Sequence, residues 1–414
     1  MKKIKVLWLS NRVLSDNLMG TGTWLSAMAE GLSTSKEITL GNISTGSLNI
    51  MTRQDYKGIT QWVFPDIHYS LNNGLPQKHY LSNIIESIEK FSPDVVHVWG
   101  TELFWGLLSA RELIKRPILL ELQGVKSAIA KVFSGGLTLK EQFDCIGLKE
   151  IIRKTTIPQE QNKFEKWGIF EREIIQGHQF ITVQSPWLVA QVRSINGDCQ
   201  VFRNEFLLQE PFYSASPWQL NKNIKIFCST SYPSPFKGLH VAIRAIAILK
   251  NKYPNIQLRI AGAYPKKGLR QDGFVGWILN ESRKLGVESN LLWLGPLTVD
   301  EIIDELQNCS VNLTPTFVEG YCLALAEALF LGVPSVVSFT GGTSYLAKDE
   351  DTALFFPPGD HVMCAYQVER LLTDTSLVER LSYSAREVAL VRNNPEQIIR
   401  NQVSIYRSIL EAKK

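Results

Sequence analysis

Two glutamates, Glu319 and Glu327, flank the beginning of a helix that the sequence predicts from Leu323 onward. Glu319 precedes Gly320, where we expect the chain to turn, and Glu327 lies about two turns along the helix. A helix that begins after such a turn presents free backbone N–H groups, which bind phosphate. A carboxylate accepts hydrogen bonds from the hydroxyls of a sugar or a ribose. The spacing alone also fits a helix cap at Glu319 and a surface charge at Glu327.

Short apolar segments alternate with helical patterns along most of the chain, which predicts an α/β protein built around parallel sheets. The predicted strands cover residues 4–9, 94–99, 117–122, 180–183, 224–228, 257–262, 291–294, 310–313 and 334–338. Helices are predicted over 102–115, from 185, near 238–252, 275–286 and 298–308, and from 323. The two glutamates therefore lie between a strand and a helix, at the sheet edge where open α/β sheets bind ligands.

The length of 414 residues exceeds what one hydrophobic core organises and predicts two domains. We place one doubly wound domain over residues 1–205, a linker rich in proline, serine and aromatic residues over 206–223, and a second doubly wound domain over 224–393. Residues 394–414 carry apolar side chains at helical spacing. Residues 125–178 are helical and mixed in charge, and such an insertion either shapes a substrate pocket or elaborates the domain.

Composition narrows the classes of function. Hydrophobic residues make up 44% and charged residues 20%, as in a globular enzyme. The net charge of +4 is too small to argue for nucleic acid as a partner. It fits an anionic substrate, loose contact with an anionic membrane surface, or ordinary solubility. Six scattered cysteines form no C-x-x-C pair, which argues against zinc and a disulfide framework and favours a reducing cytoplasm.

Targeting signals are not evident in the sequence. The apolar run over residues 4–9 is too short for the core of a signal peptide. No apolar stretch approaches the ~18 residues that span a bilayer. We therefore expect a cytoplasmic protein, either free or peripherally attached to the inner face of the membrane.

The segment around the two glutamates resembles a known signature. Glu319-Gly320-Tyr321 and Glu327-Ala328, followed by Gly332-Val333-Pro334, are similar to the E-x7-E motif of the retaining GT-B glycosyltransferases, in their large family 4 (glycosyl transferases group 1). Further matches occur in the right order at Lys237-Gly238, Ala261-Gly262, Gly341-Gly342 and 351–360, and in the N-terminal half at Gly20-Thr21-Gly22, 94–97 and Gln184-Ser185. The resemblance covers essentially the whole chain, strongly over 225–375 and more loosely over 1–205.

This resemblance implies a GT-B fold, in which two Rossmann-like domains face each other across a cleft and the last helix, here about 394–414, crosses back to the first domain. Lys237 would hold the donor diphosphate as a point charge, Glu319 would bind the transferred sugar, and Glu327 would bind the ribose. Residues 1–205 would take the acceptor and 224–393 the nucleotide-sugar. The implied donor-binding residues are Gly22, Lys237, Glu319, Gly320, Tyr321, Cys322, Leu323 and Glu327.

The backbone has its own part in that assignment. The amides around Tyr321, Cys322 and Leu323 would contact the phosphates, and Gly22 would let the first helix approach them from the other domain. A lysine at a helix start is otherwise disfavoured, since helix N-termini repel cations. The alternative for Lys237 is a solvated side chain.

Several positions depart from the family pattern. Residues 229–236 contain no arginine before Lys237, and the sequence does not choose a replacement among Arg12, Arg203, Lys266 and Lys267. Gln123 stands where the family often has histidine; it can bond a hydroxyl but cannot take a proton. Tyr345 replaces a frequent glutamate, and Cys322 replaces a frequent glycine. We interpret Cys322 as a packed small residue, because nothing basic is placed to ionise it.

His97 lies in a buried-strand pattern and is either a core residue or, with Gln123, an acceptor contact. The predicted activity is retaining transfer of a sugar from a nucleotide diphosphate-sugar to a hydroxyl of a saccharide or lipid-linked saccharide, in surface polysaccharide or glycoconjugate assembly. No cofactor and no metal are expected, because the spaced acidic pairs Asp349/Asp351 and Glu171/Glu173 do not end a buried strand of the first domain. The alternatives are a sugar-nucleotide 2-epimerase and a non-catalytic sugar-nucleotide-binding module.

Overall fold

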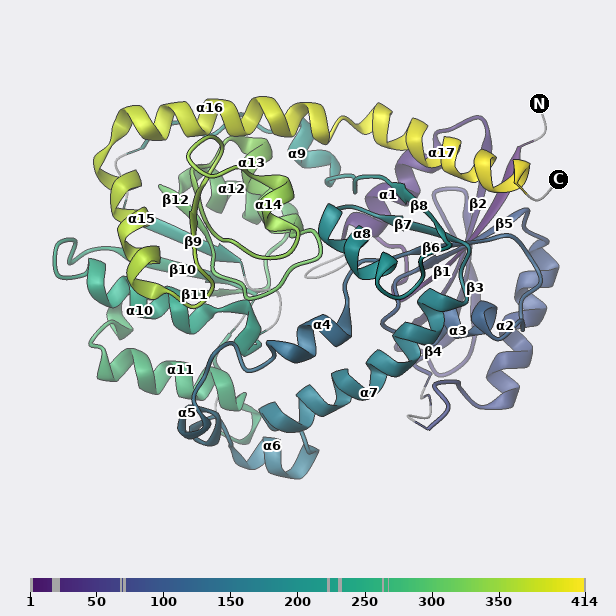
Figure 1. Ribbon diagram of the computed structural model, residues 1–414, viewed down its shortest axis with the longest axis horizontal. Helices are drawn as coiled ribbons and strands as arrows, with labels where there is room; N and C mark the ends of the chain where they lie inside the picture. Colours follow the sequence, from purple (N-terminus) through teal and green to yellow (C-terminus); the bar gives the residue numbers. More distant parts are fainter. Residues whose placement is uncertain are drawn as a thin grey trace.

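Two β-sheets organise the chain, each with helices packed against it (Figure 1). The computed structural model describes residues 3–16, 23–67, 69, 72–221, 224–229, 233–262, 264–266 and 268–412, with the side chain at 269 left out. Within these ranges no helix is long and apolar enough to cross a membrane.

The first sheet has the strand order β3-β4-β2-β1-β5-β6-β7-β8 and is parallel except where β3 pairs with β4. Its strands are β1 (Ile4–Ser10), β2 (Ile38–Gly46), β3 (Thr52–Tyr56), β4 (Ile59–Pro65), β5 (Val95–Trp99), β6 (Ile118–Glu121), β7 (Phe180–Val183) and β8 (Gln200–Arg203). The associated helices are α1 (Thr23–Ser33), α2 (Lys78–Phe91), α3 (Trp105–Ala110), α4 (Lys126–Lys131), α5 (Leu139–Asp144), α6 (Leu148–Arg153), α7 (Ile157–Gln176) and α8 (Pro186–Arg193). The strand order reverses at β1, which pairs with both β2 and β5.

The second sheet is parallel throughout, in the order β11-β10-β9-β12-β13-β14. Its strands are β9 (Lys225–Ser229), β10 (Gln257–Ala261), β11 (Leu291–Gly295), β12 (Val311–Thr314), β13 (Ser335–Ser338) and β14 (Leu354–Phe356). The longer helices are α10 (Leu239–Leu249), α11 (Gly273–Lys284), α12 (Val299–Asn308), α13 (Leu323–Leu331), α15 (His361–Thr373) and α16 (Thr375–Arg392), and α9 (Glu210–Ser214), α14 (Thr343–Leu346) and the 3-10 turn η1 (Pro235–Lys237) are short. The order reverses at β9, so the carboxyl ends of β9 and β12 meet at a switch point, where such sheets bind ligands.

The last helix, α17 (Pro395–Glu411), leaves the second domain and packs on the first (Figure 1). Its Tyr406 hydroxyl accepts a hydrogen bond from Trp8 Nε1 at 3.3 Å and lies 2.8 Å from His97 Nδ1. Gln402 accepts a bond from the side-chain amide of Asn204 at 3.0 Å. These contacts confirm the predicted return of the last helix to the first domain.

Every predicted strand is present, but five further strands are not predicted from the sequence: β2, β3, β4, β8 and β14. The predicted helix 102–115 is wrong in extent. Only Trp105–Ala110 is helical, and Glu112 has a left-handed backbone with φ of 57° that ends the segment. A residue with a Cβ rarely adopts that conformation, and nothing in the local sequence announces it.

Candidate active site

The position of Lys237 depends on the glycine that follows it. Gly238 has φ of 75°, and a Cβ there would lie 1.9 Å from the carbonyl oxygen of Pro315. Only glycine tolerates both conditions. The η1 turn that ends at Lys237 is thereby held against the loop that follows β12.

That loop carries Glu319 and enters α13. We expected the turn at Gly320, but the left-handed residue is Cys322, with φ of 76° and ψ of 73°. Such a backbone costs a residue with a Cβ about 1–2 kcal/mol. Gly320 serves a close approach instead, since a Cβ there would lie 2.6 Å from the carbonyl oxygen of Gln123 in the first domain.

Lys237 and Glu319 form an ion pair. The distance from Lys237 Nζ to Glu319 Oε1 is 2.7 Å, and the two side chains are 23% and 18% exposed. Burial lowers the pKa of Lys237, but the carboxylate of Glu319 outweighs burial, and the net pKa lies above its ordinary value. The lysine is therefore charged at neutral pH.

Glu327 lies in the same cavity but has no such partner. It is one turn into α13, not the expected two, and it is 7% exposed. Within the described ranges it makes no hydrogen bond or ion pair, and burial raises its pKa to about 8. A buried carboxyl without donors is costly, and groups that supply hydroxyl donors would stabilise it.

The cavity has a volume of about 230 Å³ and is shared by both domains. Its floor is the carboxyl end of β9 and β12, and Leu297, Val299 and Ile302 form an apolar wall. Thr23 and Trp24, at the start of α1, close it from the first domain. The remaining described lining residues are Gln209, Ser229, Lys237, Asn312, Thr314, Pro315, Thr316, Glu319, Cys322, Leu323, Ala324 and Glu327.

Residues 214–388 match the family described as glycosyl transferases group 1. The match spans less than half of the chain and lies in its C-terminal part. Among curated relatives are the glycogen synthase of Mycobacterium tuberculosis (29% identical over 151 residues, 36% of this chain and 34% of that protein) and the protein CapJ of Staphylococcus aureus (30% over 139 residues, 32% and 33%). The D-inositol 3-phosphate glycosyltransferase of Corynebacterium diphtheriae matches at 27% over 154 residues. The matched segment spans about a third of the length of each relative.

Solved structures extend the likeness to the whole chain. Sucrose-phosphate synthase from Thermosynechococcus elongatus superposes with a TM-score of 0.75 at 16% identity, over 99% of this chain and 100% of that one. The Anabaena protein HepE, in complex with UDP and glucose, gives a TM-score of 0.68 at 14% identity, over 98% and 100%. At such identities the likeness establishes the fold, which is GT-B, as the resemblance implied.

Not every residue that the group 1 motif implied reaches the cavity with its side chain. Leu323 and Cys322 line it, whereas the Tyr321 ring is buried against Phe206, with ring centroids 5.6 Å apart. The Tyr321 side chain is thus not available to a donor, and neither Tyr321 nor Gly320 is among the described lining residues. Burial raises the pKa of the Cys322 thiol, which therefore stays protonated. Gly22 lies outside the described residues.

The structure places the two residues predicted on the acceptor side, His97 and Gln123, in different environments. His97 is fully buried, its ring stacked on Trp99 at 4.1 Å and its Nε2 3.4 Å from Glu121 Oε2. Burial holds its pKa well below the ordinary value, so the ring is neutral. That is the core position that its strand pattern also allowed. Gln123 lies where the domains meet, with its carbonyl against Gly320.

None of the described candidates to replace the missing arginine lines the cavity. Arg203 stacks on the Tyr345 ring at 4.5 Å, and neither it nor Arg12 nor Lys266 lines the cavity. Lys267 lies outside the described residues. Of the described lining residues, Lys237 alone is a cation. In the part of the chain that the structure describes, no three His, Cys, Asp or Glu side chains are grouped to hold a metal.

We did not predict from the sequence that Leu297, Val299 and Ile302 form an apolar wall of the cavity. Nor did we predict that Thr23 and Trp24 close it from the first domain. Thr23 directly follows Gly20-Thr21-Gly22, so that motif was the available signal. The wall follows β11, a strand-end position that also carries ligand contacts in open α/β sheets.

Proposed function

We propose that the protein is a retaining glycosyltransferase that moves a sugar from a nucleotide diphosphate-sugar to a hydroxyl acceptor without a metal ion. One observation carries the proposal: Lys237, Glu319 and Glu327, which has no partner among the described residues, line a single cavity at the switch point of the second sheet. The cation of Lys237 suits a diphosphate, the carboxylate of Glu319 suits a sugar, and the buried carboxyl of Glu327 suits a ribose.

The diphosphate binds at Lys237 and at the beginning of α13 in this proposal. The N–H groups of Leu323 and Ala324 have no carbonyl partner among the described residues, and the first bonds of the turn come from Leu325 and Ala326 to the Cys322 carbonyl. The free N–H groups and the positive end of the helix favour an anion there. They also stabilise the negative charge that develops as the nucleoside diphosphate departs.

Donor binding replaces the ion pair between Lys237 and Glu319 with a new contact for each side chain. When the diphosphate takes Lys237, the carboxylate of Glu319 is released to accept hydrogen bonds from the transferred sugar. Departure of the diphosphate leaves an oxocarbenium-like sugar. The acceptor hydroxyl attacks from the leaving-group face and gives its proton to the departing phosphate oxygen, so no protein base is required.

The acceptor in this proposal is a saccharide or a lipid-linked saccharide, used in surface polysaccharide or glycoconjugate assembly in the cytoplasm, at the inner face of the membrane. Domain roles follow the same scheme, with residues 1–205 and α17 on the acceptor side, 206–223 as linker and 224–393 on the donor side. HepE has been solved with UDP and with UDP-glucose, which makes UDP-sugars the first donors to test.

Thermal unfolding in a panel of UDP-, GDP-, ADP- and dTDP-sugars tests donor binding, because a ligand at a hundred times its Kd stabilises the fold by about 2.7 kcal/mol. The donor that shifts the midpoint is then offered with an acceptor panel, and the anomeric configuration of the product is read by NMR. Inversion would contradict retention. Conversion of donor alone would indicate an epimerase, and binding without turnover a non-catalytic module.

A further inference from the structure

Helices α5 and α6 expose large apolar side chains that the proposed transfer does not use. Leu139 and Phe143 on α5, and Leu148, Ile151 and Ile152 on α6, are each between 53% and 75% exposed. They are spaced i, i+4 on α5 and i, i+3, i+4 on α6, so each set lies on one helix face. Large apolar side chains gathered on exposed helix faces in this way often mark a surface that binds a partner.

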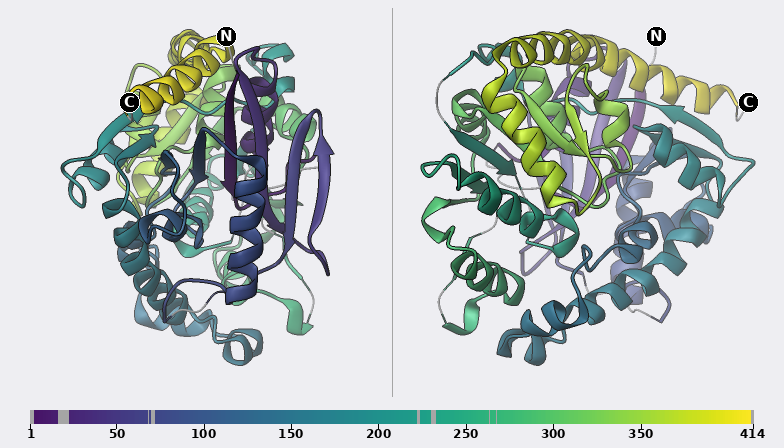
Figure 2. Two further views of the ribbon diagram at one scale, coloured as in Figure 1. Left: turned by 90° about the vertical axis from the view of Figure 1, so that its right-hand side faces the viewer. Right: turned by 60° about the vertical axis from the view of Figure 1, so that its left-hand side comes forward.

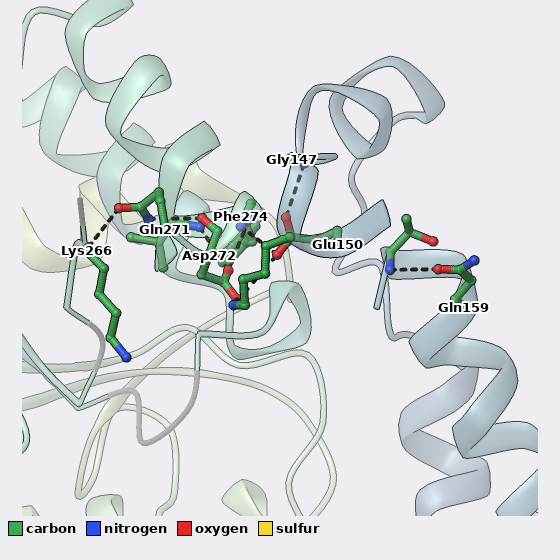
Figure 3. A network of polar contacts seen from close by, with 11 residues as sticks. Gly147, Glu150, Gln159, Lys266, Gln271, Asp272 and Phe274 are labelled. Carbon is green, nitrogen blue, oxygen red and sulfur yellow. Dashed lines mark hydrogen bonds and ion pairs between the residues drawn. The ribbon is translucent and has the colours of Figure 1, made fainter. Parts of the chain in front are cut away.

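The polarity of these helices is inverted. Glu150 of α6 is only 6% exposed and accepts hydrogen bonds from the backbone N–H groups of Gly147 at 3.2 Å and Gly273 at 3.1 Å (Figure 3). Lys149 pairs with Asp272 of the second domain at 3.2 Å. A surface helix of a globular protein normally packs its apolar face against the core. In α6 the charged face is turned inward instead.

Helix α5 is anchored in the same way. Its Glu141 pairs with Arg244 on α10, and the carbonyl of Gly135 before the helix lies 2.9 Å from His240 Nε2. Because the inward contacts are polar and specific, the apolar faces cannot turn inward without breaking them. The outward orientation is therefore built into the fold.

Exposed charge around the apolar residues is mainly positive. Lys140, Arg153 and Lys154 are exposed and form no ion pair in the described ranges. Of the three acidic residues between 139 and 154, Glu141 and Glu150 are bonded inward, which leaves Asp144. Apolar side chains with flanking cations match the acyl boundary and headgroups of an anionic bilayer.

We propose that the outward face of α5 and α6, defined by Leu139, Phe143, Leu148, Ile151 and Ile152 with Lys140, Arg153 and Lys154, docks on an anionic membrane surface. The two helices lie at the lower end of the molecule in Figure 1 and in both views of Figure 2, so they can meet a flat surface. Behind them, Cys145, Glu150, Phe133 and Phe236 line a second cavity of about 100 Å³. Phe236 directly precedes Lys237 in the chain, so this second cavity adjoins the η1 turn that carries the lysine of the donor site.

Sedimentation with vesicles tests this without donor or acceptor. The protein should pellet with vesicles of phosphatidylcholine mixed with phosphatidylglycerol and much less with phosphatidylcholine alone. Phe143→Ser/Ile151→Ser/Ile152→Ser should weaken that partitioning by about tenfold or more, since each buried CH₂ contributes to it. The matched control, Tyr383→Ser/Val388→Ser/Val391→Ser, changes exposed apolar residues of α16 and should bind like the unaltered protein.

Charge is tested separately. Lys140→Gln/Arg153→Gln/Lys154→Gln should weaken binding to the anionic vesicles by about tenfold or more, and so should a rise from about 0.1 M to about 1 M salt. Equal binding of all variants, or no vesicle binding, would overturn the proposal. Loss of a dimer in the serine variant, seen by light scattering without vesicle binding, would show a second copy of the chain as the occupant instead.

The docking surface rests on the proposed location at the inner face of the membrane, but its test can fail or succeed separately from the transfer activity. The serine variant should keep the thermal response of the unaltered protein to UDP-sugars, because the changed side chains lie away from the donor cavity. Vesicle binding without any donor binding would leave the membrane surface standing and reject the transfer activity. Donor turnover without vesicle binding would support the transfer activity and reject the membrane surface.

Discussion

Lys237 Nζ lies 2.7 Å from Glu319 Oε1, so the two charged groups assigned to different parts of the donor neutralise each other in the ligand-free protein. The pair has two consequences. It satisfies two charges that the cavity would otherwise hold uncompensated. It also means that a donor must supply the phosphate charge that replaces Glu319 beside the lysine.

Glu319→Gln should therefore separate binding from transfer. The amide keeps the shape of the side chain but no longer competes with a diphosphate for Lys237, so affinity for free nucleoside diphosphate should be unchanged or higher. Transfer should fall roughly 10- to 100-fold, because a charge-assisted bond to a sugar hydroxyl contributes about 1.5–3 kcal/mol. Calorimetry and turnover rates give the two readings; turnover at the unaltered rate would contradict the assignment of Glu319.

Lys237→Met should weaken diphosphate binding and transfer together and leave nucleoside binding unchanged. It should also destabilise the fold by about 1–3 kcal/mol, because Glu319 is then a partly buried charge without its partner. Lys237→Met/Glu319→Gln should recover most of that stability but none of the diphosphate affinity. Titration with nucleoside, monophosphate and diphosphate is the measurement. An equal loss for all three ligands would show that Lys237 is not the phosphate contact.

Periodicity and motif order together predicted the fold, for reasons visible in particular strands. Buried strands such as β5 and β7 are continuous apolar runs and were recognisable. β3, with the sequence TRQDY, is an exposed antiparallel strand at the sheet edge, where pairing rather than burial defines it. β2 contains Gly41, Asn42 and Ser44, which break the apolar pattern although all are buried.

The site was predicted less completely, because spacing does not specify contacts across the chain. The motif indicated Lys237 and Glu319 separately, but their pairing depends on Gly238 packing against Pro315. The family pattern often has glycine at the position of Cys322, which was a signal for the left-handed backbone found there. We nevertheless expected the turn at Gly320. The environment of His97 depends on Tyr406, 309 residues away in sequence, which no local pattern reveals.

Cys322 offers a test of backbone strain. Cys322→Gly and Cys322→Ala both remove the thiol, but only glycine adopts φ of 76° without steric cost. The glycine variant should be more stable than the alanine variant by about 1 kcal/mol, the reverse of their usual order in helices. Denaturant unfolding of both variants measures the difference. A more stable alanine variant would contradict the left-handed conformation of residue 322.

Transfer should survive chelation. Charge on the departing diphosphate is neutralised in the proposal by Lys237 and by the N–H groups at the start of α13, and hard oxygen ligands for magnesium would have to converge on the same phosphates. Glu319 and Glu327 are assigned to hydroxyls. Activity in excess EDTA should stay within about twofold, which corresponds to ~0.4 kcal/mol in the barrier. Complete loss that magnesium or manganese restores would overturn metal independence.

Glu327 should make nucleoside binding depend on pH. Burial raises the pKa of its carboxyl to about 8, so the group is mostly protonated at neutral pH in the free protein. Ribose hydroxyls donate to the ionised form and favour it, so binding releases a proton. Affinity for the nucleoside of the donor should therefore rise with pH from about 6 to about 8, by at most about tenfold per pH unit. Calorimetry in buffers of different ionisation enthalpy measures the released proton.

Glu327→Gln is the matched control. The pH dependence of its stability checks the direction of the Glu327 pKa shift. When the pKa of a carboxyl is higher in the folded than in the unfolded protein, the fold becomes less stable as pH rises between the two pKa values. For Glu327 these values are about 4.5 and about 8. Relative to the unaltered protein, the variant should therefore gain stability between pH 5 and pH 8, by up to a few kcal/mol. Glu121, whose pKa burial also raises to about 8, is present in both proteins and cancels in the comparison. The variant should bind nucleoside weakly and independently of pH, whereas an unchanged pH slope would remove Glu327 from the ribose site.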